Sequence, residues 1–232
     1  MRKGDEKKQV ILAASEKLFC LRGYHETSIQ DILDTLKTSK GSFYHHFESK
    51  EAVLITLCAQ RAERACAACE EKLAAIQRPI DRLNAVLQAA MPIRQDETSF
   101  LAMLTPLLFT QEGRMVAYCY QDALRSAFMP LLDRELSAAM ASGVIFPPRQ
   151  AMLADLVLTL VNRCWLHASD VMMQSIRTAR TVNPADLDEE LALYRTSLER
   201  LLDAPFGSIE LIRLPEWFAV AQALERRVHL PK

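Results

Sequence analysis

The sequence of 232 residues predicts an all-α protein with a small N-terminal unit and a larger C-terminal helical unit. Apolar residues recur with a period near 3.6 along almost every segment, and no segment keeps the alternation of period two that is typical of strands. Residues that end or begin helices, such as Gly23, Gly143 and Asn183-Pro184, separate these periodic runs. The chain is also long enough for two compact units.

Composition and charge narrow the class of protein. Half of the residues are hydrophobic and a quarter are charged, as in globular proteins, and the formal net charge of −1 does not by itself predict a nucleic-acid partner. The charged N-terminus lacks the apolar run of a secretion signal, and Asp155 and Arg163 interrupt the apolar stretch 153–166. We therefore expect a cytoplasmic protein with no membrane contact.

The first 50 residues predict three helices. The first spans about 6–21 and buries one apolar face, and Gly23 ends it in a left-handed conformation so that Tyr24 folds back onto that face. A second helix is expected to open at a capping box of Thr27 and Gln30 and to stop near residue 36. Ser39 is placed to cap a third helix over about 40–46.

The remaining residues, 51–232, predict a helical domain. Ser49 caps a helix that we expect to continue to about Ile76, so that it joins the two units. Further helices are expected at about 79–94, 98–110, 112–142, 148–180, 184–203 and 215–228.

The stretch from Thr27 to Glu51 carries the strongest functional signal. In a helix-turn-helix the second helix enters the DNA major groove through its N-terminal residues, which must be short, polar or cationic. The run Thr38-Ser39-Lys40-Gly41-Ser42 meets that requirement, while Phe43 and Phe47 share the opposite face and should anchor the helix. Lys40 lies at a helix N-terminus, where a cation is disfavoured, so a facing phosphate or guanine is a reasonable compensation.

In this region the chain resembles the TetR family of bacterial transcriptional regulators, and the resemblance covers about the first 55 residues. The residues that carry the resemblance are Phe19, Gly23-Tyr24, Thr27, Ile32, Ser39–Phe47 and Ser49-Lys50-Glu51. The resemblance implies an N-terminal three-helix helix-turn-helix DNA-binding domain, a C-terminal ligand-binding and dimerisation domain, and a homodimer on a pseudo-palindromic DNA operator. It also implies phosphate contacts from Thr27, Tyr44, His45 and Lys50.

The turn departs from the family's common Ala-Gly-Val, because this chain has Leu36-Lys37-Thr38. Lys37 is therefore expected to adopt a positive φ at a cost of about 1 kcal/mol and to offer an additional phosphate contact. The complete set of predicted DNA-binding residues is Thr27, Lys37, Thr38, Ser39, Lys40, Gly41, Ser42, Tyr44, His45 and Lys50.

The second domain supplies predicted dimer and ligand sites. The predicted dimer interface consists of Leu153, Val157, Leu160, Val161, Cys164, Leu191, Tyr194 and Leu198, for which packing within the protomer is an equal alternative. A small effector, lipophilic or aromatic, is expected among Met91, Phe100, Met103, Phe109, Tyr118, Tyr120, Trp165 and His167. We expect a repressor whose helix after Ser49 acts as a lever that releases the operator when the effector binds.

Other functions remain open alternatives at this stage. The five histidines form no spaced metal motif, and the sequence has neither a nucleophile elbow nor a phosphate loop, so we expect no enzyme, metal or cofactor. The Cys66-x-x-Cys69 pair lies in a helical run and is interpreted as structural. A thiol-responsive regulator that uses Cys66 or Cys119, and a non-catalytic helical adaptor for protein partners, are the alternatives.

Overall fold

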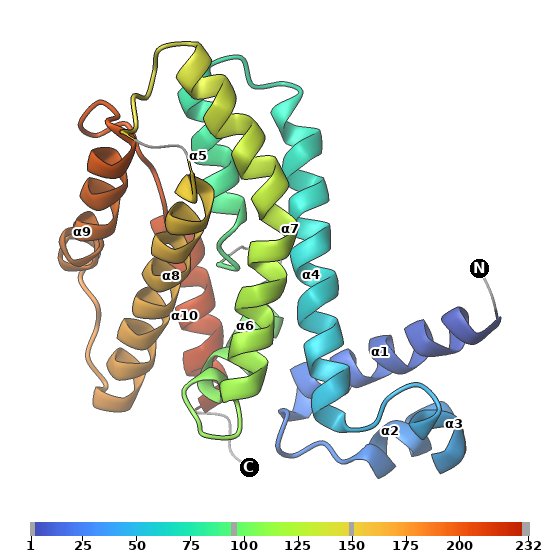
Figure 1. Ribbon diagram of the computed structural model, residues 1–232. Coiled ribbons are helices and arrows are strands. Elements are labelled where there is room, and N and C mark those ends of the chain that lie inside the picture. The colour runs from blue at the N-terminus through green and yellow to red at the C-terminus, as the bar shows by residue number, and fades with distance from the viewer. Residues whose placement is uncertain (1–2, 94–96, 149–150, 229–232) are drawn as a thin grey trace.

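The computed structural model describes residues 3–93, 97–148 and 151–228, and within these residues it contains ten α-helices and no strand, which confirms the all-α prediction (Figure 1). The helices are α1 (Lys3–Arg22), α2 (Ile29–Leu36), α3 (Lys40–Tyr44), α4 (Lys50–Leu73), α5 (Pro79–Ala89), α6 (Thr98–Leu108), α7 (Arg114–Ala141), α8 (Leu153–Thr178), α9 (Pro184–Leu202) and α10 (Leu214–Val228).

The N-terminal domain consists of α1, α2 and α3 packed around the first turns of α4, at one end of the molecule (Figure 1). Its apolar core is shielded from solvent: Ile11, Phe19, Ile32 and Phe43 are each 0% exposed. Tyr24 returns onto α1 as expected, with its ring centroid 5.3 Å from that of Phe19. These contacts hold α3 on the outer side of the domain.

The start of α2 corrects one prediction. Ser28, not Thr27, is the N-cap: its hydroxyl accepts from the Asp31 backbone N–H at 3.1 Å, and the Asp31 carboxylate accepts from the Ser28 N–H at 2.8 Å. Thr27 is unable to cap because its side chain is fully buried and its hydroxyl donates to the Gly23 carbonyl at 2.7 Å. The predicted box of Thr27 and Gln30 is therefore wrong by one position.

The turn between α2 and α3 behaves as the sequence predicted. Lys37 has φ 48° and ψ 46°, a left-handed conformation that glycine adopts freely and lysine adopts at a cost. The Lys37 N–H bonds to the Asp34 carbonyl at 3.3 Å, and the Thr38 N–H bonds to the Leu33 carbonyl at 3.1 Å. These bonds close the end of α2 and turn the chain into α3.

Helix α4 runs from the N-terminal domain along α7, so its two ends belong to different parts of the molecule (Figure 1). Its far end is fixed by Arg82 of α5, whose guanidinium donates to the carbonyls of Leu73 at 2.6 Å and Ile76 at 3.2 Å. The same guanidinium forms a paired salt bridge with Glu135 of α7 at 2.7 and 2.8 Å. The helix ends at Leu73, three residues before the predicted end, and Arg82 binds the carbonyls released there.

The C-terminal domain contains the rest of α4 and α5 to α10, with α8 and α9 on the side away from α4 (Figure 1). Helix α10 packs against α6, and the buried indole of Trp217 donates to the Ala168 carbonyl of α8 at 2.9 Å. The predicted helix bounds agree within a few residues, except that α5 ends at Ala89 and α8 begins at Leu153. The start predicted for that helix borders residues 149–150, which lie outside the described residues.

Candidate nucleic-acid interface

Helix α3 has one buried face and one exposed face. Ser39 caps it, with its hydroxyl accepting from the Ser42 N–H at 3.3 Å. Phe43 is 0% exposed and packs against Phe47, at 6.1 Å between ring centroids. This apolar anchor holds the helix so that its polar residues face outward.

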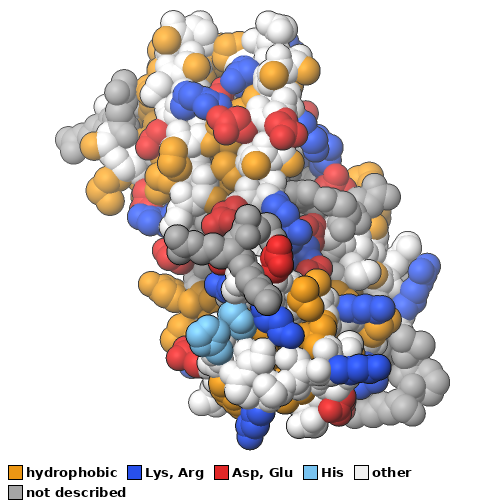
Figure 2. Space-filling model, turned by 90° about the vertical axis from the view of Figure 1, so that its right-hand side faces the viewer, with side chains coloured by type: hydrophobic (Ala, Val, Ile, Leu, Met, Phe, Trp, Pro, Cys, Tyr) orange, Lys and Arg blue, Asp and Glu red, His pale blue; other side chains and the backbone are white. Residues whose placement is uncertain are grey.

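The exposed face gathers most of the predicted DNA-binding residues. The exposed members are Lys37, Ser39, Lys40, Gly41, Tyr44 and His45, whereas Thr38 and Ser42 are half-buried. The Lys40 Nζ lies 5.9 Å from the centre of the Tyr44 ring, so these two side chains share one patch. Figure 2 shows histidine side chains in the lower part of the face it presents, with basic side chains nearby.

The charges of this face are available to an outside partner. In the described part of the chain, no carboxylate lies within ion-pair distance of Lys37 or Lys40. The neighbouring Asp31 is already used, since it caps α2 and pairs with Arg22 of α1 at 3.1 Å. Hydrogen bonds from Ser28 and the Arg22 charge lower the pKa of the Asp31 carboxyl, so it stays ionised in this role.

Gly41 lies on the exposed face of α3. A Cβ placed on Gly41 meets no atom within 4 Å, and the residue has no positive φ, so the fold does not require glycine there. Glycine is also a poor helix former. The described fold therefore gives no reason for a glycine at this position.

Thr27 and Lys50, two of the predicted phosphate contacts, have internal partners instead. The buried hydroxyl of Thr27 bonds within the chain, as described above. The Lys50 ammonium donates to the carbonyls of Tyr24 at 2.7 Å and Thr27 at 2.8 Å and lies 4.3 Å from the centre of the Tyr24 ring. Burial lowers the pKa of Lys50. Both residues hold the connection between α1 and α2 in place, a role that only the tertiary structure reveals.

The predicted effector residues separate into three groups. Five of them pack in the core of the C-terminal domain, at 1–4% exposure: Met91, Phe100, Met103, Tyr120 and Trp165. Two lie at the surface, since Phe109 is 38% and Tyr118 is 67% exposed. His167 faces α9, where its Nε2 lies 3.5 Å from Glu190. The five residues of the first group all belong to the buried hydrophobic core, and Tyr120 and Trp165 are in direct contact.

Trp165 differs from the other buried residues of that group. Its ring meets Tyr120 edge-on at 6.3 Å between centroids, and its indole N–H is buried without a hydrogen-bond partner in the described part of the chain. An unsatisfied buried donor costs about 1–3 kcal/mol. Trp165 thus places one unused hydrogen-bond donor in the buried core.

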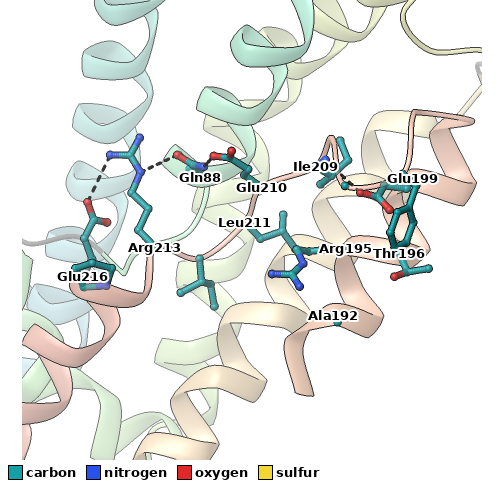
Figure 3. Close-up of a pocket in the computed structure, with 14 residues that line it drawn as sticks. Gln88, Ala192, Arg195, Thr196, Glu199, Ile209, Glu210, Leu211, Arg213 and Glu216 are labelled. Carbon is teal, nitrogen blue, oxygen red and sulfur yellow. Dashed lines mark hydrogen bonds and ion pairs between the residues drawn. The ribbon is translucent and has the colours of Figure 1, made fainter. Parts of the chain in front are cut away.

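A cleft of about 800 Å³ was not foreseen from the sequence. It lies between α9, the start of α10 and the end of α5, and its lining includes Arg195, Leu211 and Glu216 (Figure 3). Its polar groups bond one another: Arg213 donates to Gln88 at 2.9 Å, and Gln88 donates to Glu210 at 3.3 Å. These bonds hold the segment before α10 onto α5, so they have a structural role already.

The predicted dimer residues are mostly internal. Six of them are 0–4% exposed within one protomer: Leu153, Val157, Val161, Cys164, Leu191 and Leu198. Leu160 and Tyr194 are half-buried. The apolar residues that α8 and α9 turn outward are Leu156 and Leu193, at 48% and 71% exposure. The period of 3.6 located both helices correctly but did not distinguish their inner faces from their outer faces.

The cysteine thiols are shifted toward their protonated form. Burial raises the pKa of all six cysteine thiols, Cys66 and Cys119 included, and a thiol with a raised pKa is a weaker nucleophile at neutral pH. Cys66 and Cys69 face different helices, with sulfur contacts to Ala127 and Ala85. The described residues contain no group of three metal-ligating side chains and no helix with the length and apolarity needed to span a membrane.

Comparisons with known proteins agree with this geometry. Residues 11–57 match the family model described as "Bacterial regulatory proteins, tetR family". A curated relative, the uncharacterised HTH-type transcriptional regulator YerO of Bacillus subtilis, is 46% identical over 54 residues, which are 23% of this chain and 19% of that protein. The match therefore spans less than a fifth of that relative's length.

Similarity to solved structures extends over both domains. A TetR-family regulator from Pectobacterium atrosepticum superposes with a TM-score of 0.62 at 20% identity, covering 88% of this chain and 99% of that one. FadR of Bacillus subtilis, solved with stearoyl-CoA, gives 0.52 at 18% identity, covering 87% and 99%. The fold is thus that of these regulators. Over residues 11–57 the chain is thus similar to the tetR family, and beyond these residues the similarity shown is one of fold.

Proposed function

We propose that the protein is a homodimeric regulator that binds double-stranded DNA at a pseudo-palindromic operator through α3. The observation that carries this proposal is the exposed face of α3, where Lys40, Gly41 and Tyr44 lie side by side and no carboxylate of the described residues pairs with Lys40. Residues at the start of such a helix read base edges, and neighbouring cations neutralise phosphates. Lys37 supplies a cation that the common glycine of this turn lacks.

Two copies are needed because one short helix reads only a few base pairs. In dimers of this kind the two recognition helices lie about 34–36 Å apart, one turn of DNA. Helices α8 and α9 offer the outward apolar side chains Leu156 and Leu193 for a four-helix contact about a two-fold axis. Leu160 and Tyr194, both half-buried, border that face.

The effector is proposed to be lipophilic, with a hydrogen-bond acceptor, and to bind beside Trp165. The support is the unpaired indole N–H within an apolar interior and the stearoyl-CoA complex of the similar FadR. Phe100 gives a physical route to the DNA-binding domain, because its ring lies 3.8 Å from the Arg61 guanidinium. Arg61 in turn pairs with Glu16 of α1 and Glu97. A ligand that displaces Phe100 would therefore act on α1.

The proposed action is release of DNA on effector binding, as in a repressor. Arg82 and Glu135 fix the far end of α4, so the end that can move is the one at Lys50. A small rotation there changes the distance between the two copies of α3. The ligand must bind the released form more tightly for this shift to occur.

Selection of bound DNA from a random pool tests the DNA-binding proposal. We expect a two-fold symmetric consensus whose half-sites are one helical turn apart. A pool that shows no enrichment, or an enriched sequence without symmetry, contradicts the operator proposal.

The effector proposal is tested with Trp165→Phe, which removes the unpaired N–H and keeps most of the apolar volume. We expect an almost unchanged melting temperature and a loss of the DNA release that stearoyl-CoA or another long-chain acyl compound causes in the wild type. The operator affinity without ligand, which Trp165→Phe should leave unchanged, is the control. Release by the acyl compound that is equal in Trp165→Phe and in the wild type would exclude a site at Trp165.

A further inference from the structure

The last helix of the chain reaches the DNA-binding domain. The Arg227 guanidinium of α10 donates to the carbonyls of Cys20 at 2.6 Å and Phe19 at 2.8 Å, at the end of α1. Its Nη2 also lies 3.5 Å from the position of a Cβ on Gly23. More than 200 residues of sequence separate these partners, so the contact is purely tertiary.

Arg227 is used there as a cap for the end of a helix. The carbonyls at the end of α1 are exposed to a further donor: that of Phe19 also accepts from the Gly23 N–H at 3.0 Å, and a cation stabilises the negative end of the helix dipole. Burial lowers the pKa of Arg227, and no carboxylate of the described residues lies within ion-pair distance of it. The α1 carbonyls are thus what this half-buried charge binds.

Helix α10 is held firmly enough to transmit position. Trp217, Val220 and Leu224 are each 0–1% exposed and form its inner face, which packs against α6 and bonds to α8 through Trp217. Arg227 follows Val220 by one heptad and so continues that face. The helix has 15 residues, about 22 Å, and it ends on the side of the C-terminal domain where the DNA-binding domain lies (Figure 1).

A second cation holds the other side of the same connection. Lys50 of α4 binds the carbonyls of Tyr24 and Thr27, whereas Arg227 binds those of Phe19 and Cys20. The segment 19–27, which joins α1 to the recognition helices, is therefore held from α4 on one side and from α10 on the other.

We propose that Arg227 is a positioning residue for DNA binding: through the end of α1, it makes α10 a second mechanical link that fixes the orientation of the DNA-binding domain on the C-terminal domain. This inference rests on the proposed DNA-binding function only in its second test. According to this proposal, α10 and α4 together determine which half-site spacing the protein prefers.

Amide hydrogen exchange tests the contact without DNA. In Arg227→Ala, peptides covering residues 19–27 should exchange about tenfold faster than in the wild type, because the released carbonyls destabilise the end of α1. Arg226→Ala, at the exposed neighbouring residue, is the matched control and should leave this exchange unchanged. If Arg227→Ala does not fold, the same measurement is made on Arg227→Gln, whose amide is a shorter and uncharged donor.

Operators with altered spacing test the positioning role. The wild type should discriminate strongly between its preferred half-site spacing and the same operator with one base pair added or removed, and Arg227→Ala should lose about tenfold of that discrimination. A merely stabilising residue would lower the affinity for all spacings alike. Exchange and discrimination both equal to those of Arg226→Ala would overturn the proposal. Failure of the wild type to bind any operator refutes the proposed function, and the exchange result still decides the contact.

Discussion

The exposed face of α3 and the interior around Trp165 differ in what their residues imply about function. On α3, the exposed side chains of Lys40 and Tyr44 form no hydrogen bond with the described residues, and the proposed DNA contact gives them a role. Around Trp165, aromatic and Met side chains close the core of the domain, which any helical protein needs. An exposed residue without a structural task is therefore better evidence of function than a buried aromatic residue.

The largest expected effect comes from the anchor beneath the exposed face. Phe43→Ala should lower the free energy of unfolding by about 3–5 kcal/mol, because it empties a fully buried site. Operator affinity should fall with it, since α3 loses its support. Urea unfolding followed by circular dichroism measures the change, and a loss below 1 kcal/mol would contradict the anchor.

Removal of an exposed side chain should separate binding from stability. Lys40→Ala should weaken operator binding by about 1–3 kcal/mol, with little change in melting temperature. If Lys40 contacts a phosphate, the slope of the logarithm of the binding constant against that of the salt concentration should also decrease by about one. Fluorescence anisotropy at several salt concentrations checks this. Lys72→Ala, at an exposed lysine near the far end of α4, is the control and should bind DNA normally. Equal affinity of both variants would place the interface elsewhere.

Gly41→Ala should move stability and binding in opposite directions. The open space around Gly41 predicts a gain of up to about 1 kcal/mol in unfolding free energy, because alanine is the better helix former. Operator affinity should decrease, since the added methyl group occupies the surface that approaches the groove. Thermal melts and anisotropy on the same preparation compare the two. Stabilisation without any loss of affinity would show that the groove does not come this close.

The smallest effect is expected at the turn. Lys37→Gly relieves the left-handed strain but gives the unfolded chain more freedom, which leaves a net gain of about 0.5 kcal/mol. If Lys37 contacts a phosphate, the same change weakens binding and reduces the salt dependence. A variant that is more stable and binds unchanged assigns Lys37 to the turn alone.

The sequence by itself determined the helical class, the order of the helices and the location of the recognition helix. These features depend on local chemistry: Ser39 caps, Gly23 and the positive φ of Lys37 end helices, and the period of 3.6 places Phe43 inward. Each depends on residues a few positions apart. Even the misplaced cap at Thr27 failed by one residue only, because Thr27 found a partner four residues back.

Only the tertiary structure decided how the two domains are joined. The internal role of Lys50, the inner and outer faces of α8 and α9, the cleft beside α10 and the cap that Arg227 places on α1 all depend on residues far apart in sequence. Periodicity states that a helix has an apolar face but not which neighbour covers it. From sequence alone, a lysine or arginine is expected at the surface. Only the fold shows that Lys50 and Arg227 bind backbone carbonyls of the N-terminal domain.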